Sequence, residues 1–167
     1  NNLIHNNEVG SVILFEAKFG FPWLNKNNFR YSKEFGGGAL LDAGGYTIHS
    51  ARKFFMREPV NIHAIVNFDE ANVDIHGSIM LDFGDDQTAH LTFGFNNYYQ
   101  NNYSVWCTQG RIKVCRAFSI PANFQPEIII EKNNQKKSIK LDPCNQFVKQ
   151  IHNFAYGINN KKKVEEW

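Results

Sequence analysis

From residue 60 onward, apolar residues occupy every second position in one segment after another. PVNIHAIVNFD (59–69), VDIHGSIMLDFG (73–84) and QTAHLTFGF (87–95) show this alternation, and the last two flank a turn at Gly84-Asp85-Asp86. A period of two is typical of strands that bury one face, and short turns between such strands favour antiparallel neighbours. We therefore expect strands over these segments and also at 11–19, 103–108, 111–118, 127–131 and 138–141.

Other segments carry the apolar spacing of helices. One runs from about Ala39 to Met56, and another begins where Asp142 and Pro143 offer a capping carboxylate and a proline for the first helical position. Leu3-Ile4 is expected to end an earlier helix. With 167 residues, 43% of them hydrophobic, the chain suffices for one sizeable core but not for two ordinary domains. The prediction is one α+β domain over residues 1–167, with helices packed on one face of a large, mostly antiparallel β-sheet.

Charge and cysteine content narrow the choice of partners and location. The formal net charge of +2 comes from interspersed residues, and the one basic run, Lys161 to Lys163, is short, so no nucleic-acid partner is expected. No run reaches the roughly 18 apolar residues that span a bilayer, so no membrane is expected. The three cysteines form no CxxC pair, which favours a reducing, cytoplasmic location without disulfides or zinc.

The segment GGGALLDAGGYTIHSARKFF (36–55) combines a helical pattern with five glycines. On a helix with about 100° per residue, Asp42, Tyr46, His49 and Lys53 fall within an arc of roughly 60°. Each interior glycine costs on the order of 0.5–1 kcal/mol relative to alanine, so the glycines need a reason. One reason would be close helix packing, which the absence of side chains permits. The other would be a polar or anionic ligand that comes close to the backbone at Gly37, Gly38, Gly44 and Gly45 and to the first helical N–H groups.

This segment resembles the signature helix of the glucose–fructose oxidoreductase and inositol dehydrogenase family, also called Gfo/Idh/MocA. The family pattern is glycine-rich and continues as L-x-D-x-G-x-[H/Y]; this chain matches it at Gly37, Gly38, Leu41, Asp42, Gly44 and Tyr46. Upstream, Asn28-Phe29-Arg30-Tyr31 is similar to the aromatic-Arg element of the family. Three later segments also resemble family elements: VDIHGSIMLDFGDDQTAHLTFGF a pair of strands, TQGRIKV a turn, and NQFVKQIHNFAYGI the closing helix. The likeness therefore covers nearly the whole chain in the same order.

The resemblance implies that residues 1–167 are the C-terminal, substrate-binding and oligomerisation domain of a two-domain oxidoreductase. Its N-terminal Rossmann domain is absent from this chain, and the fragment alone is predicted to be inactive. The cofactor would be NAD or NADP, bound mainly by the absent domain. The substrate would be a sugar or a nucleotide sugar, with motif similarity closest to nucleotide-hexose 3-ketoreductases. The resemblance also implies a homodimer, or a dimer of dimers, through the open face of the sheet.

The resemblance also assigns roles to individual residues. Tyr46 is expected to exchange the proton on the oxygen of the reacting carbon. A phenol ordinarily has a pKa of about 10, so a nearby cation, the family's lysine from the absent domain, would assist this exchange. Asp42 would accept hydrogen bonds from a substrate hydroxyl, and Arg30 would contact a phosphate or a ring oxygen. His49 would lie beside the substrate or be an alternative proton carrier. Asp42 and His49 could be metal ligands, but the sequence shows no third ligand to join them, so no metal is expected.

The residues allow other interpretations. Tyr46 could be a core tyrosine whose hydroxyl is satisfied within the protein. Asp74 and His76 share a strand face and are expected on a solvated or interface surface, and Arg52 is expected to pair with a neighbouring carboxylate. The whole domain could also be non-catalytic and used for oligomerisation or small-molecule sensing, or it could act on a cyclic polyol. The presence of both Asp42 and Tyr46 in the motif favours the enzyme.

Overall fold

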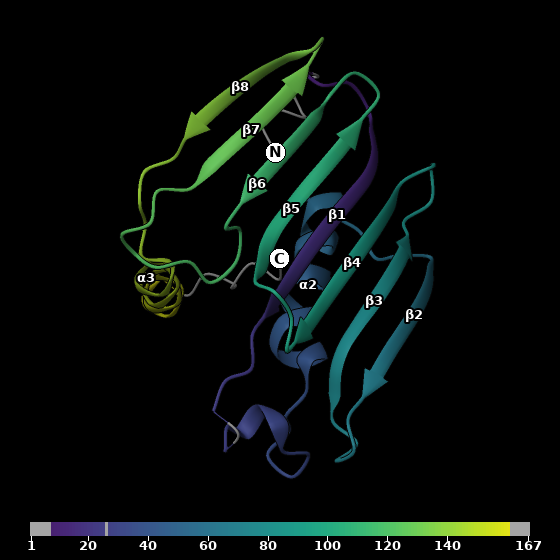
Figure 1. The fold of residues 1–167 in the computed structure, drawn as a ribbon. Coiled ribbons are helices and arrows are strands. Elements are labelled where there is room, and N and C mark those ends of the chain that lie inside the picture. Colours follow the sequence, from purple (N-terminus) through teal and green to yellow (C-terminus); the bar gives the residue numbers. More distant parts are fainter. Residues whose placement is uncertain (1–7, 26, 161–167) are drawn as a thin grey trace.

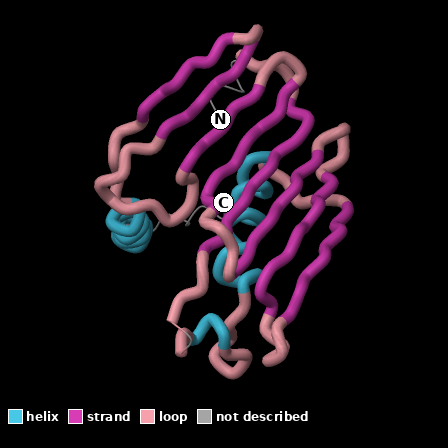
Figure 2. Tube along the Cα trace, viewed as in Figure 1, coloured by secondary structure: helices cyan, strands magenta, loops and turns pink. Residues whose placement is uncertain are grey.

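The computed structural model describes residues 8–25 and 27–160. Its main element is one eight-stranded sheet with the order β2-β3-β4-β1-β5-β6-β7-β8 (Figures 1 and 2). Neighbouring strands are antiparallel except β1 and β4, so the predicted α+β class with a mostly antiparallel sheet is confirmed. The strands are β1 (Val12–Phe21), β2 (Asn61–Phe68), β3 (Asp74–Asp82), β4 (Thr88–Phe95), β5 (Gln100–Cys107), β6 (Arg111–Cys115), β7 (Glu127–Lys132) and β8 (Gln135–Lys140).

β1 lies in the middle of the sheet although it is the first strand of the chain (Figure 1). Phe15 pairs with Ala89 of β4 on one side and with Val105 of β5 on the other. The strand predicted at 11–19 is therefore confirmed. It joins two antiparallel groups, β2–β4 and β5–β8, into one sheet.

One face of the sheet carries the core and is covered by η2 (Leu40–Gly44) and α2 (Gly45–Phe55) (Figure 1). Phe15 of β1 is buried, and its ring lies 5.1 Å from that of Phe54 and 6.4 Å from that of Phe55. Phe55 also packs on Phe83 with a centroid distance of 4.4 Å. Aromatic contacts of this kind stabilise beyond the area they bury, so α2 is fixed on the central strands.

The edge strand β2 departs from the sequence-based expectation. Its alternate apolar residues were expected to be buried, yet Ile62 is 62% exposed and Phe68 is also exposed. Ile62 nevertheless pairs with the buried Leu81 of β3. The helix, however, packs over β1 and β4 and leaves this edge uncovered (Figure 1).

The helix expected from Ala39 to Met56 has two parts. Leu40–Gly44 form a π-helical turn, and the α-helix α2 follows and ends before Met56, which is left-handed with a φ of 54°. π-helical turns are rare and occur frequently at functional sites. Asp42 lies in this turn and Tyr46 in the first turn of α2.

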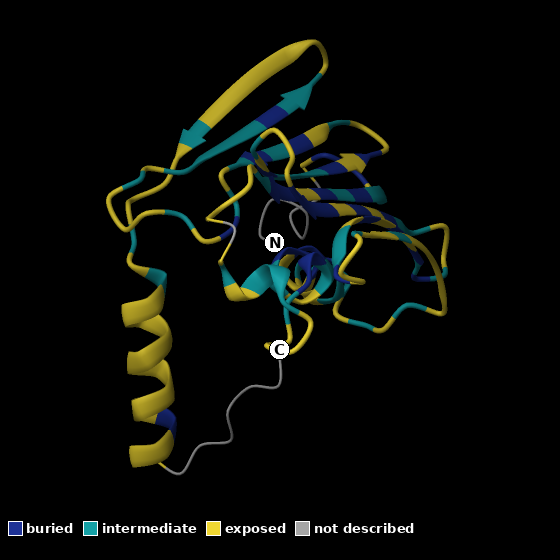
Figure 3. Ribbon diagram, turned by 60° about the horizontal axis from the view of Figure 1, so that its bottom comes forward, coloured by how far each residue is buried: buried dark blue, intermediate teal, exposed yellow. Residues whose placement is uncertain are grey.

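α3 (Gln146–Asn159) projects away from the sheet, and its residues are exposed except for Gly157 and the half-buried Gln146 (Figure 3). It begins later than predicted, because Asn145 and not Asp142 caps it: the side chain of Asn145 accepts a hydrogen bond from Val148 N at 3.2 Å. The predicted helix end at Leu3-Ile4 lies outside the described residues.

Candidate active site

Tyr46 is an exposed residue whose ring is held by aromatic contacts. The ring meets that of Phe19 edge-on at a centroid distance of 5.3 Å and that of Phe118 at 6.1 Å. The residue is 42% exposed, and among the described residues its hydroxyl has no hydrogen-bond partner. A tyrosine sealed in the core would be neither exposed nor unpartnered. Tyr46 is therefore an exposed residue whose hydroxyl forms no hydrogen bond to a described residue.

Phe118 reaches Tyr46 because β6 ends earlier than the predicted 111–118. Arg116 and Ser119 adopt positive φ angles of 57° and 42°, which end the strand after Cys115. The buried side chain of Asn101 then holds the following segment: it accepts a hydrogen bond from Phe118 N at 2.7 Å and donates one to Phe118 O at 2.5 Å. This support for Tyr46 had no sequence signal, because Asn101 and Phe118 are 17 residues apart.

Arg30 and Asp42, which we both expected to bind substrate, bind each other. Arg30 Nε donates to Asp42 Oδ2 at 2.8 Å, and their side chains are 27% and 26% exposed. This hydrogen bond raises the pKa of the Arg30 guanidinium, although partial burial acts in the opposite direction. One carboxylate oxygen of Asp42 is thus already occupied by a protein cation. The expected hydrogen bond between Asp42 and a substrate hydroxyl stays a prediction.

The glycines of the motif have different surroundings. At Gly37 a Cβ atom would lie 2.4 Å from Arg30 O, so a side chain would collide with the backbone of η1 (Phe29–Tyr31). At Gly44, which is buried, a Cβ would lie 3.1 Å from the ring of Phe93 in β4. Helix packing therefore explains Gly44, and a ligand against its backbone is not supported. Gly45 is exposed, with no neighbour nearer than Leu40 O at 4.0 Å, and it alone of these positions leaves open space.

The start of the helix is occupied by a side chain from the sheet. Asp74 of β3 accepts a hydrogen bond from Leu40 N at 2.5 Å. A Cβ at Gly38 would lie 2.1 Å from Asp74 Oδ1, so Gly38 makes room for that carboxylate. The expectation that the first helical N–H groups attract an anionic ligand is thus wrong for Leu40, because a carboxylate of the protein already takes that place. Asp74 was expected on a solvated or interface face, and nothing in the sequence links it to a helix 34 residues away.

The remaining predicted residues are less engaged. His49 is exposed on α2, and the structure shows no partner for it among the described residues. Arg52 pairs with Glu58 through Nε and Oε2 at 2.8 Å, as expected for an ordinary surface ion pair. Within residues 8–25 and 27–160 no group of three or more potential metal ligands is present. In the same part of the chain, no helix has the length and hydrophobicity needed to cross a membrane.

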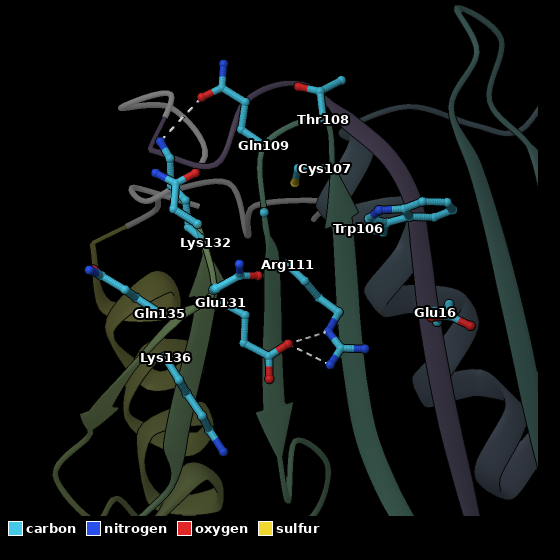
Figure 4. A pocket seen from close by; sticks show the side chains of 13 residues that line it. Glu16, Trp106, Cys107, Thr108, Gln109, Arg111, Glu131, Lys132, Gln135 and Lys136 are labelled. Carbon is cyan, nitrogen blue, oxygen red and sulfur yellow. Dashed lines mark hydrogen bonds and ion pairs between the residues drawn. The ribbon is translucent and has the colours of Figure 1, made fainter.

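A cavity of about 770 Å³ lies on the sheet face opposite α2, away from Tyr46 (Figure 4). Trp106 borders it, together with the pair of Arg111 and Glu131, whose Nε and Oε2 atoms are 3.0 Å apart. Glu16 of β1 lies at its other side. Sequence reasoning did not identify this hollow, because strand alternation places these residues on one face but does not say that the face is concave.

Comparisons with known proteins place this geometry in a family. Residues 1–113 match the model of the GFO/IDH/MocA C-terminal domain. A dTDP-3,4-didehydro-2,6-dideoxy-alpha-D-glucose 3-reductase from Saccharopolyspora spinosa is 35% identical over 99% of this chain and 50% of its own length. The protein of the same name from Actinomadura kijaniata is 31% identical over 99% of the chain and 50% of its own length.

Solved structures agree with this assignment. KijD10, a 3-ketoreductase from Actinomadura kijaniata in complex with NADP and TDP-benzene, superimposes with a TM-score of 0.93 at 31% identity, over 99% of this chain and 51% of that one. The chain spans about half the length of the curated relatives it matches. On the family model and the fold, this chain belongs to the Gfo/Idh/MocA oxidoreductase family and corresponds to its C-terminal domain.

Proposed function

We propose that this chain is the substrate domain of an NADP-dependent reductase that acts on a carbonyl carbon of a nucleotide-linked deoxysugar. The observation that carries the proposal is Tyr46, an exposed residue whose hydroxyl has no hydrogen-bond partner among the described residues and which lies one turn from Asp42 on the signature helix of the family. Relatives that are 31–35% identical bear the name of a sugar-nucleotide 3-reductase, and a matched structure contains NADP.

The start of the signature helix is poorly suited to the phosphates of the dinucleotide. The glycine-rich turn would be the natural candidate, but Asp74 occupies its Leu40 N–H and would repel an anion. We therefore assign the cofactor mainly to the N-terminal half that the relatives possess and this sequence does not include. When bound, it would supply the hydride.

The residues of this chain would then handle the proton and the orientation of the sugar. Tyr46 donates its hydroxyl proton to the oxygen of the carbonyl that is reduced, and afterwards regains a proton from solvent. The contacts with Phe19 and Phe118 keep its ring in place during this exchange. The open space at Gly45 lets the sugar ring come close to the helix beside Tyr46.

The proposal is tested by assaying the full-length protein with dTDP-3,4-didehydro-2,6-dideoxy-glucose and either NADPH or NADH. We expect oxidation of the reduced nicotinamide that depends on the sugar nucleotide and is faster with NADPH. The isolated chain of 167 residues is expected to show no turnover. Saturable binding of the sugar nucleotide without any turnover by the full-length protein would favour the alternative, a sensing or oligomerisation domain.

We also propose that the protein is a homodimer, or a dimer of dimers, through the sheet face opposite α2. Exposed apolar side chains, those of Ile65, Met80 and Trp106, lie on this face among polar ones. Light scattering should therefore give at least twice the protomer mass for the full-length protein. The double variant M80E/W106E should lower the mass, whereas Y98E, in an exposed turn, should not. An unchanged mass for M80E/W106E would exclude this face. A cytoplasmic location likewise stays a prediction.

A further inference from the structure

The backbone of Arg30 is held by the glycine-rich turn. Arg30 O accepts a hydrogen bond from Gly38 N at 3.0 Å, and Gly37 N donates to Ser32 O at 2.9 Å. Because any side chain at Gly37 would collide with Arg30 O, the turn can close on η1 in this way only with glycine there. The motif glycines thus bring a loop residue to the helix that carries Tyr46.

The side chain of Arg30 is held at two of the three nitrogens of its guanidinium. Nε donates to Asp42 at 2.8 Å, and Nη1 donates to Asn28 Oδ1 at 3.3 Å. The same Asn28 oxygen accepts from Arg30 N at 3.1 Å, which ties side chain and backbone together. Among the described residues no acceptor is bonded to Nη2, and the side chain is 27% exposed. The guanidinium therefore presents fixed, unused N–H groups at the surface.

Arg30 and Tyr46 are two hydrogen-bond donors that differ in whether they can give up the proton. Asp42 and Tyr46 are four residues apart on the same helical segment, and Asp42 binds Arg30, so both donors lie at the same part of the helix. A phenol can transfer its proton, whereas a guanidinium cannot be deprotonated in a protein. The bond to Asp42 makes proton loss from Arg30 still less favourable, since it raises the pKa of the guanidinium.

We infer that Arg30, positioned by Asp42, binds the carbonyl oxygen adjacent to the one that is reduced, and so determines which carbon of a vicinal dicarbonyl sugar receives the hydride. This inference rests on the proposed function and on the two neighbouring carbonyl groups of the sugar in the relatives' names. At the reduced carbon the C=O π bond opens, a C–H bond forms with the hydride of the dihydronicotinamide, and the oxygen takes the proton of Tyr46. The oxygen on Arg30 receives no proton, so its carbonyl persists. Asp42 is in this scheme a positioning residue, not a substrate ligand.

A double-mutant cycle in the full-length enzyme separates these roles. Arg30→Gln should lower kcat/KM by about ten- to a hundred-fold, the usual effect of losing a charged hydrogen bond, and should give a mixture of the two hydroxy-ketone products. Asp42→Asn should give a smaller loss, by about three- to ten-fold. If Asp42 acts through Arg30, adding D42N to R30Q should change nothing further.

Products are identified by NMR after dephosphorylation, and Arg52→Gln, which makes the same chemical change in the surface ion pair with Glu58, is the matched control. If R30Q does not fold, Arg30→Lys keeps the charge but lacks the planar fork, and it too should give mixed products. A single product from active R30Q or R30K overturns the inference, and so does a D42N effect that multiplies with that of R30Q. A wild-type enzyme that does not reduce the dicarbonyl sugar would instead contradict the proposed function.

Discussion

Replacement of Tyr46 by phenylalanine is expected to lower kcat of the full-length enzyme by about 10²- to 10⁴-fold, the range attributed to a positioned proton donor. The change removes one oxygen and leaves the ring, so its contacts with Phe19 and Phe118 should persist. The KM for the sugar nucleotide should change little, because the proton is transferred only in the transition state. Steady-state kinetics over a range of pH, with NADPH saturating, measure both parameters.

The control for this experiment is Tyr98→Phe, which makes the same chemical change in an exposed turn between β4 and β5. It should leave kcat unchanged. Equal kcat values for Y46F and the wild type would remove Tyr46 from the reaction. His49, exposed on the same helix, would then be the next residue to replace.

Replacement of Gly38 by alanine is expected to destabilise the chain by about 3 kcal/mol, from backbone strain together with loss of the contact between Asp74 and Leu40 N. Gly38 has a φ of 129°, which side chains rarely adopt, and a methyl group there would displace the Asp74 carboxylate. The free energy of unfolding is measured by urea titration. The helix start carries Asp42, so activity of the full-length enzyme should fall as well.

Gly36→Ala provides the matched comparison. Gly36 also has a positive φ, of 67°, but no atom lies within 4 Å of its added Cβ. It should therefore cost only the left-handed strain, about 1 kcal/mol. If G36A and G38A destabilise equally, the Asp74 contact contributes nothing and strain alone explains both. Asp74→Asn keeps the shape of the side chain and removes its charge. It should lower the free energy of unfolding by part of the G38A amount, because it weakens the contact with Leu40 N without adding backbone strain.

Periodicity along the chain predicted the strands and the helix that covers the sheet, because each pattern is local. It could not predict that the face of β2 with Ile62 stays exposed, since this depends on how far α2 extends across the sheet. The site was predicted in part: Tyr46 is accessible, as expected, but the pairing of Arg30 with Asp42 was not foreseen. That pairing depends on how a loop folds back, and the Asp74 contact depends on strand register. Contacts between residues that are far apart in the sequence produce no local residue pattern from which they could be predicted.

The central place of β1 has a consequence for how the chain acquires its structure. Its neighbours β4 and β5 are separated from it by some 70 residues or more, as the pairs Phe15–Ala89 and Phe15–Val105 show. During synthesis β1 therefore emerges from the ribosome long before β4 and β5, and until then its apolar residues are not covered by neighbouring strands. Sheets whose strands pair over long sequence distances fold slowly, and until they have folded their unpaired strand edges promote aggregation. We expect chaperone dependence and inclusion bodies to be the practical obstacle when the domain is expressed alone.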